Sequence, residues 1–453
     1  MTTDPLELLC AANPLPHGSA APPLERVLER IDRERRPGRR WRGRTGALVP
    51  ALGAAVAIAV GAVALVLIGV HPRGAPAHHA TVTQPVPPAP PGGMRGVVSL
   101  DGAGFVSAAA GVVSLEQCLG YRNGEPTGHT SCRDWLASTT DAGASWRIGR
   151  RPFNVFDPRF SGSDGWAEGS LALSGGTSLA RFLVSHDGGR SWKVASSAAP
   201  PLGNQEVSVG GDSVWAVGGS CVRGCTVTIM HGALTGSNLT ATAAQPISGG
   251  FTNVEVVAAG PRTAYVNNPD AFGQAFVTHD DGRSWRRIAP PCPRRSFGRL
   301  SSDGSSGSVW ATCDGGHGSA TLARTTDRGR SWQSLAGRFV DAFQFRPVSA
   351  QIAWGASPLG FVIRTTDGGL TWSTVWSISA SQRLALRAHA PRVACLDGCA
   401  TMLTAQSATS ASVVIILTHG RGGKKARFTN LVVYRTSDSG ATWHPSVVHL
   451  PDH

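Results

Sequence analysis

Two segments of this sequence concentrate side chains that could bind a ligand. One lies between Cys118 and Cys132, and the other spans residues 420–427. Their candidate ligand-binding residues are Tyr121, Arg122, His129, Arg421, Lys424, Lys425 and Arg427. Guanidinium and ammonium groups bind carboxylates and phosphates, so both segments could recognise an anionic ligand. The alternative for residues 420–427 is a solvated hairpin tip that binds nothing.

Carboxylates recur in a motif, Thr/Ser-x-Asp-x-Gly-x-Ser/Thr-Trp, that occurs six times. Its Asp can accept backbone N–H groups two residues on, its Gly permits a positive φ, and its hydroxyl adds another local bond. The Trp is expected to fold back and bury most of its surface. The motif therefore predicts a tight turn rather than a catalytic acid. The predicted structural residues are Asp141, Gly143, Trp146, Asp187, Gly189, Trp192, Asp280, Gly282, Trp285, Asp327, Gly329, Trp332, Asp367, Gly369, Trp372, Asp438, Gly440 and Trp443.

The spacing of the motif indicates how many units the chain contains. Successive aspartates are 46, 93, 47, 40 and 71 residues apart, and a period of roughly 20 to 50 residues indicates stacked units. The step of 93 corresponds to two units, with one motif lost near Thr228–Gly236. A second register of aromatic residues, expected on the second strand of each unit, gives seven units if Cys395 takes the seventh place. Its aromatic members are Phe105, Trp166, Trp215, Tyr265, Trp310 and Trp354.

Each unit consists of short runs rich in Val, Ala, Thr and aromatics, separated by Gly, Ser and Asp. Such runs are typical of strands joined by turns, and no helical pattern of useful length follows residue 94. Units of about 40 to 50 residues with four strands each predict a β-propeller, whose radial packing protects sheet edges. The predicted fold is all-β: a seven-bladed β-propeller of four-stranded antiparallel blades over residues 94–453, preceded by a single transmembrane helix.

The repeated motif resembles the Asp-box, or bacterial neuraminidase (BNR) repeat, of sialidases, sortilin-type receptors, some β-glucanases and photosystem II assembly and stability factors. The resemblance covers about residues 94–453, and the single-ring layout is most similar to the assembly-factor branch. It implies that each box lies in the turn between the third and fourth strands, away from the ligand-binding face. Loops between second and third strands would then open on the ligand-binding face.

These loops are unequal in length. From the expected second-strand position to the box aspartate, the separation is 36 residues in the first unit and 43 in the last, against 13 to 21 in four others. The first and last blades are neighbours in a closed ring. We therefore expect the 118–132 and 420–427 segments to stand side by side as one recognition surface.

The N-terminal part predicts a membrane anchor. Residues 47–70 form an uncharged stretch that is long enough for a helix to span a bilayer. Nine arginines lie between Arg26 and Arg44, against Arg73 alone just beyond the span, so residues 1–46 are predicted to be cytoplasmic. Residues 71–93 read as a Pro-rich stalk. The alternative is a cleaved signal ending near Ala75–Ala77.

The cytoplasmic segment contains one short amphipathic pattern, from about Pro22 to Arg35, in an otherwise disordered stretch. This pattern could lie on anionic lipid or bind a cytoplasmic partner, or it could serve only to set the topology. The predicted location is the bacterial plasma membrane, with the propeller outside the cell. Many arginines, few lysines and abundant Ala and Gly favour a bacterium of high GC content.

Eight of the nine cysteines lie beyond the predicted span and fall into close pairs. Such pairs outside the cytoplasm predict four local disulfides. A zinc site shared by the last two short loops is the alternative, but no His stands at ligand spacing beside them. The predicted pairs are Cys118 with Cys132, Cys221 with Cys225, Cys292 with Cys313, and Cys395 with Cys399.

The net charge of +13 favours an acidic partner. For a domain outside the cell, an acidic protein, an anionic glycan or a wall polymer is a more plausible partner than nucleic acid. No metal-binding, phosphate-binding or nucleophile motif occurs, so we predict no cofactor and no catalytic residue. A sialidase would also need three arginines, a Tyr–Glu pair and an acidic Asp, and its Arg-Ile-Pro signature is missing.

The predicted function is therefore a non-catalytic binding or assembly module for a protein or glycan. Two alternatives remain. One is a sialidase-like or other glycoside hydrolase with a displaced active site. The other is a transmembrane sensor coupled to residues 1–46.

Overall fold

The computed structural model describes residues 97–118, 121–122, 125–126, 132–172, 178–201, 207–220, 226–247, 254–268, 274–292, 298–314, 319–340, 344–357, 360–377, 401–419 and 427–449. Within these ranges the regular secondary structure is entirely β. No helix long and apolar enough to span a bilayer occurs among them. The predicted span at residues 47–70, the stalk and the cytoplasmic segment lie outside the described residues.

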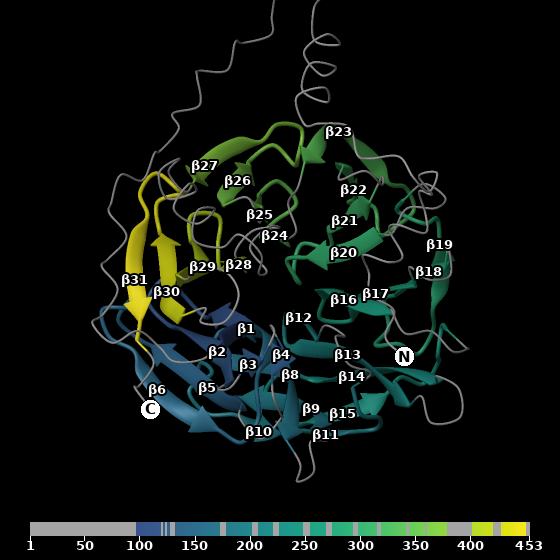
Figure 1. Cartoon of the computed structure of the whole chain (residues 1–453). Helices are drawn as coiled ribbons and strands as arrows, with labels where there is room; N and C mark the ends of the chain where they lie inside the picture. Colours follow the sequence, from purple (N-terminus) through teal and green to yellow (C-terminus); the bar gives the residue numbers. More distant parts are fainter. Residues whose placement is uncertain are drawn as a thin grey trace, which may run out of the picture. The chain divides into compact units, whose positions relative to one another are not determined.

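The described strands form seven sheets of four or five strands, which we call blades 1 to 7, and one small two-stranded sheet (Figure 1). Blade 1 contains β1 (Val97–Phe105), β2 (Gly111–Cys118), β5 (Cys132–Thr139) and β6 (Arg147–Arg151). Blade 2 contains β7 (Phe156–Ser161), β8 (Asp164–Ala172), β9 (Ser178–Ser185) and β10 (Lys193–Val194). Blade 3 contains β12 (Ser208–Gly210), β13 (Ser213–Ser220), β14 (Thr226–Ala233), β15 (Asn238–Ala241) and the added β11 (Ser196–Ser197).

The remaining blades repeat the same pattern. Blade 4 contains β16 (Glu255–Gly260), β17 (Thr263–Asn268), β18 (Gln274–Thr278) and β19 (Arg286–Ile288). Blade 5 contains β20 (Gly298–Ser302), β21 (Val309–Asp314), β22 (Ser319–Thr325) and β23 (Gln333–Val340). Blade 6 contains β24 (Gln344–Pro347), β25 (Ala353–Ser357), β26 (Phe361–Thr365) and β27 (Ser373–Ser377). Blade 7 contains β28 (Thr401–Ala405), β29 (Ala411–His419), β30 (Arg427–Thr436) and β31 (His444–Val448).

The seven blades surround a common axis, with the first strand of each blade innermost and the fourth outermost (Figure 1). The four strands of each blade pair antiparallel in chain order, as the sequence predicts. Blade 3 differs, because β11 pairs in parallel with its outer strand β15. Blade 3 is also the unit that lacks the box motif. Its β14–β15 turn lies at the expected place near Gly236.

The hydrophobic core lies between neighbouring blades rather than at the axis. One cluster joins Trp166 of blade 2 to Val214 and Met230 of blade 3, and another joins Trp354 of blade 6 to Leu403 of blade 7. Successive residues of a second strand point to opposite faces of the blade. Because each face packs against a neighbouring blade, side chains on both faces are buried. Five second-strand aromatics are completely buried: Trp166, Trp215, Tyr265, Trp310 and Trp354.

The ring closes without exchanging a strand between its ends. Blade 1 is built entirely from the N-terminal end of the propeller and blade 7 entirely from the C-terminal end. The two blades are joined by one apolar cluster that includes Phe105 and Trp135 of blade 1 and Val414 and Val433 of blade 7. Side-chain packing, rather than a strand shared between the two ends, therefore holds blades 1 and 7 together.

The aromatic register was wrong at its two ends. Phe105 lies on β1, the first strand, and Cys395 lies outside the described residues. In blade 6, Trp354 on the second strand pairs with the residue directly before the box motif. The second-strand residues that pair in the same way are Val112 in blade 1 and Ser412 in blade 7. Their separations from the box aspartates are 29 and 26 residues, shorter than predicted but still the longest. The register failed because neither position carries an aromatic.

Candidate functional site

All six Asp-box motifs adopt one geometry in the turn between the third and fourth strands. In blade 4, Asp280 Oδ1 accepts the Thr278 hydroxyl at 2.8 Å and the backbone N–H of Ser284 at 3.0 Å. Its Oδ2 accepts the Ser284 hydroxyl at 2.6 Å, and Gly282 N–H donates to Thr278 Oγ1. The accepted amide is four residues on, not two as predicted. The Ser284 hydroxyl bond is the largest influence that lowers the pKa of Asp280 to about 2.

The box turns also join each blade to the one before it. Gly440 has a φ of +91°, and a Cβ there would lie 2.7 Å from Val375 Cβ of blade 6, so both conformation and space require glycine. Nε1 of Trp443 donates to Val375 O, and Nε1 of Trp332 donates to Ala289 O of blade 4. The box residues thus have a structural role that leaves the carboxylates occupied.

The box tryptophans are less buried than expected. Trp192 and Trp443 are buried, whereas the other four are half-buried. Two of these four, Trp285 and Trp332, donate through Nε1 to backbone carbonyls of Ala244 and Ala289. The largest apolar burial therefore belongs to the second-strand aromatics, such as Trp310 and Trp354, and not to the motif that identifies the repeat.

Three arginines directly before the box motif form a second set of joints, which sequence reasoning missed. Arg324 and Arg364 each lie 5.2 Å from the ring centre of the tryptophan opposite, and each donates to a backbone carbonyl of the next blade. Arg435 instead lies between Phe105 and Trp146 of blade 1, at 4.6 and 5.3 Å from the ring centres. Burial lowers its pKa to about 10.

A cavity of about 380 Å³ occupies the axial channel, and we call it the axial cup. Every blade contributes a residue from its first strand. These include Phe105, Phe160, Val209, Val257, Leu300, Phe345 and Ala405. Two guanidinium groups, Arg159 and Arg346, also line the cup, together with Asp303 and several hydroxyl side chains.

The axial cup opens at the Asp-box end of the ring. Its lining residues lie at the carboxyl ends of the first strands and continue into the following turns, as at Ser161–Gly162 and Ser302–Asp303. First and third strands run in the same direction within each antiparallel blade, so these turns and the box turns share one end. This is the end that the Asp-box resemblance assigns to structure rather than to ligand.

An ionic cluster includes both arginines of the cup. Asp157 of blade 2 accepts from Arg159 of the same strand, and its Oδ1 accepts from Arg346 Nη2 of blade 6 at 3.3 Å. Asp157 itself is not among the residues that line the cup. The cup therefore presents two cations that share a carboxylate from outside its lining.

A second polar cluster lies on blade 1, near the other end of the ring. Glu116 on β2 stands directly opposite Asp134 on β5, and Asp101 sits at a register shift in β1. Burial, followed by the charge of Glu116, raises the pKa of Asp101 to about 8 and that of Asp134 to about 6. The described residues contain no group of acids, His and Cys that could hold a metal ion.

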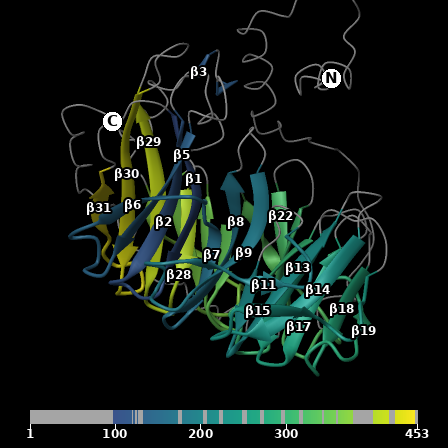
Figure 2. The same cartoon turned by 90° about the horizontal axis from the view of Figure 1, so that it is seen from below.

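The two long segments predicted as a recognition surface both connect second and third strands, and the strand ends that flank them lie at the end of the ring opposite the cup. Within the first, β3 (Tyr121–Arg122) pairs with β4 (Glu125–Pro126), and Figure 2 shows β3 beyond the strands of blade 1. Arg427 begins β30, where it pairs with His419. His129, Arg421, Lys424 and Lys425 lie outside the described residues, and the side chains of Tyr121, Arg122 and Arg427 are not described.

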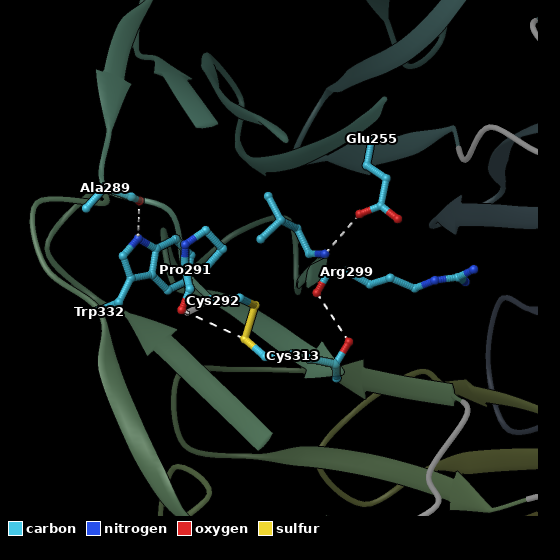
Figure 3. The surroundings of a disulfide bond; sticks show 9 residues. Glu255, Ala289, Pro291, Cys292, Arg299, Cys313 and Trp332 are labelled. Atoms are coloured by element: carbon cyan, nitrogen blue, oxygen red, sulfur yellow. Dashed lines mark hydrogen bonds between the residues drawn. A yellow bond between two sulfur atoms is a disulfide. The ribbon is translucent and has the colours of Figure 1, made fainter. Parts of the chain in front are cut away.

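One predicted disulfide is present between Cys292, which follows blade 4, and Cys313 on β21 of blade 5. Figure 3 shows it beside two other links between the same blades: Trp332 donates to Ala289 O, and Leu300 N–H donates to Glu255 Oε2 at 3.2 Å. Cys132 is disulfide-bonded, and the strand register places Cys118 opposite it. Cys221, Cys225, Cys395 and Cys399 lie outside the described residues.

The strand order and the box turns define a seven-bladed β-propeller with Asp-box turns. No protein-family model matches the sequence, and no curated protein matches it. Among solved structures, the chain is similar to YCF48 bound to D1 peptide, with 15% identity and a TM-score of 0.42 over 76% of this chain and 95% of that one.

Two enzymes are also among the similar structures. Prolyl oligopeptidase B from Galerina marginata is 9% identical, with a TM-score of 0.47 over 78% of this chain and 52% of that one. The Hadza microbial sialidase Hz136 is 14% identical, with a TM-score of 0.37 over 61% of this chain and 65% of that one.

Proposed function

We propose that this chain is a binding module that a membrane anchor holds outside the cell, and that its ligand is a protein or an anionic glycan. The axial cup is the observation that carries the proposal. It is a polar recess, about 380 Å³ in volume, that receives residues from all seven blades and two guanidinium groups. Its volume lies within the range of about 300–1,000 Å³ typical of ligand pockets.

Several features support recognition rather than catalysis at this cup. Among the described residues, Asp303 is the only carboxylate that lines it, and its oxygens accept from the backbone and hydroxyl groups of Ser305 and Ser306 in the same turn. The six box aspartates are likewise held by their own turns. A rigid recess built from seven separate strands suits the selection of a shape and a charge, and Arg159 and Arg346 supply the charge.

The long segments of blades 1 and 7 form a second proposed contact surface, at the opposite end of the ring. Residues 118–132 and 420–427 carry Tyr, His, Arg and Lys side chains that suit an acidic partner. With an anchor at residues 47–70, the ring would stand outside the plasma membrane on the stalk of residues 71–93. Residues 1–46 would remain free for a cytoplasmic partner or for anionic lipid.

Binding by the full-length chain tests this proposal. Arrays of acidic peptides, sialylated glycans and anionic wall polymers would be compared with neutral counterparts, together with turnover of fluorogenic sialosides and β-glucans. We expect salt-sensitive binding to one acidic class and no turnover. Binding to no member of the arrays, or turnover that survives purification, would contradict the proposal.

The carboxylates of blade 1 favour a second candidate, a glycoside hydrolase. Asp101 has a pKa of about 8 and could donate a proton at neutral pH, while Glu116 and Asp134 lie on adjacent strands. If turnover of a β-glucan or sialoside is found, Asp101→Asn should abolish it while leaving the ring folded. Arg346→Gln, at the other end of the ring, should not affect it.

A further inference from the structure

The contact between Asp157 and Arg346 crosses the axis of the ring. Asp157 belongs to blade 2 and Arg346 to blade 6, which are separated by blades 7 and 1 on one side and by blades 3, 4 and 5 on the other. The two residues are 189 positions apart in the chain. This ion pair therefore depends on the closed ring and not on the packing of neighbouring blades.

The backbone of β7 departs from a regular strand to place Asp157 there. Its pairing with β8 shifts register between Phe156 and Arg159, and Asp157 has a φ of +39°. Non-glycine residues rarely adopt a positive φ, so the backbone at Asp157 is strained. A Cβ at Gly102 of β1 would lie 2.7 Å from Asp157 N and 2.9 Å from Pro158 Cδ, so glycine leaves the room that the bulge needs.

The result is one carboxylate shared by two guanidinium groups. The side chains of Arg159, Asp157 and Arg346 keep 22%, 27% and 18% of their surfaces exposed, so solvent reaches all three. Both arginines line the cup, whereas Asp157, which contacts both, is not part of the lining. A ligand that enters from the Asp-box end would meet the two cations before it met their acceptor.

We propose that the axial cup binds a carboxylate of its ligand, which takes the place of Asp157 between Arg159 and Arg346. The inference rests on the proposed function and specifies its ligand chemistry. Planar guanidinium groups match the two oxygens of a carboxylate, and Asp157 shows that one carboxylate can be shared by both. Asp157 acts as an internal occupant that a ligand must displace.

Charge favours a carboxylate over a phosphate. Asp157 contacts both arginines, and a second carboxylate, Asp303, lines the cup. A carboxylate replaces Asp157 one charge for one, whereas a phosphate dianion would bring excess negative charge near both acids. The cup is also large enough for the chain end of an acidic peptide or for an acidic sugar, since its volume is about 380 Å³.

Acetate is the probe that tests this exchange, on the purified full-length chain. Asp157→Ala removes the internal occupant, so we expect acetate to bind that variant about ten-fold more tightly than the unmodified chain. Acetate should then raise its Tm more than chloride does at the same ionic strength. The double variant Asp157→Ala, Arg346→Gln should lose this difference. Arg299→Gln, an exposed arginine beside the cup that does not line it, is the matched control.

Equal effects of acetate and chloride on Asp157→Ala would overturn the inference. Should that variant be too unstable to measure, Asp157→Asn keeps the size of the side chain and takes its place. If both variants are unfolded and acetate restores the fold of neither, Asp157 is required for folding and the inference is wrong. A ligand whose binding is insensitive to Asp157→Ala and Arg346→Gln would also overturn it, yet would leave the proposed binding function intact.

Discussion

The guanidinium of Arg435 in blade 7 lies 4.6 Å from the ring centre of Phe105 in blade 1, across the junction that closes the ring. It is 4% exposed, and none of its three nitrogens meets a hydrogen-bond acceptor among the described residues. Arg364 holds the same position in blade 6 but donates through Nε and Nη2 to Ala408 O. The two arginines differ in how they are stabilised.

This difference predicts opposite outcomes for the same substitution. Arg364→Met removes charged hydrogen bonds and should cost about 1.5–3 kcal/mol of unfolding free energy. Arg435→Met removes a buried cation without an acceptor and fills the space between two rings, so it should leave the unfolding free energy unchanged within about 1 kcal/mol or raise it. Urea unfolding of both variants measures this. A larger loss for Arg435→Met than for Arg364→Met would contradict the assignment.

The burial of the tryptophans predicts which ones support the ring. Trp354 is fully buried and Trp372 of the same blade is half-buried. Trp354→Ala should therefore cost about 3–5 kcal/mol of unfolding free energy, because it leaves a cavity between blades 6 and 7. Trp372→Ala should cost clearly less. Chemical unfolding of the two variants gives the comparison. Equal losses would show that the box tryptophan contributes as much unfolding free energy as the fully buried one.

The raised pKa of Asp101 predicts a pH dependence of stability. Its folded pKa of about 8 lies above the unfolded value of 3.8, so the folded chain holds an extra proton between these values. This group's contribution to stability is complete below about pH 4 and is lost as the pH rises toward 8. Asp101→Asn should remove that loss and raise Tm at pH 8 relative to the unmodified chain.

Thermal unfolding at pH 5, 7 and 9 measures the effect. The box aspartates have lowered folded pKa values, about 2 for Asp280, and influence stability only below about pH 4, so they do not interfere in this range. Asp134→Asn is the matched control, because the smaller rise to about 6 predicts a smaller gain at pH 8. A Tm difference between Asp101→Asn and the unmodified chain that does not change with pH would refute the assignment.

The disulfide between Cys292 and Cys313 predicts a local loss of stability on its removal. It closes a loop with a sequence separation of 21 across the junction of blades 4 and 5. Cross-links of this length contribute about 3 kcal/mol, mainly by restricting the unfolded chain. The double variant Cys292→Ala, Cys313→Ala should lose about that much in urea unfolding. An unchanged transition midpoint would show that the remaining contacts at this junction, including Trp332 with Ala289, are sufficient alone.

The repeat itself could be predicted from the sequence, because the box motif forms a local turn. Thr278, Asp280, Gly282 and Ser284 bond to one another within seven residues, so their chemistry is visible as a pattern. The count of seven followed from the spacing of these turns. The second register failed in blades 1 and 7, where Val112 and Ser412 stand in place of an aromatic.

The cup could not be predicted in the same way. Asp157, Arg159 and Arg346 lie on inner strands of two distant blades and belong to no shared motif. Their meeting depends on ring closure and on a bulge in β7, neither of which leaves a mark in a single sequence. The arginines before the box were accessible in principle, because Arg324, Arg364 and Arg435 precede the motif in three successive units.

Each blade consists of one uninterrupted stretch of chain, apart from the short β11. The unit that repeats in the sequence is therefore also the unit of the sheet, and the junction of blades 7 and 1 is chemically one more boundary of the same kind. A circular permutant opened between blades 4 and 5, with its original ends joined by a linker, should re-form the same ring. Propellers of this design can also gain or lose a whole module by duplication or deletion without dividing any strand ladder.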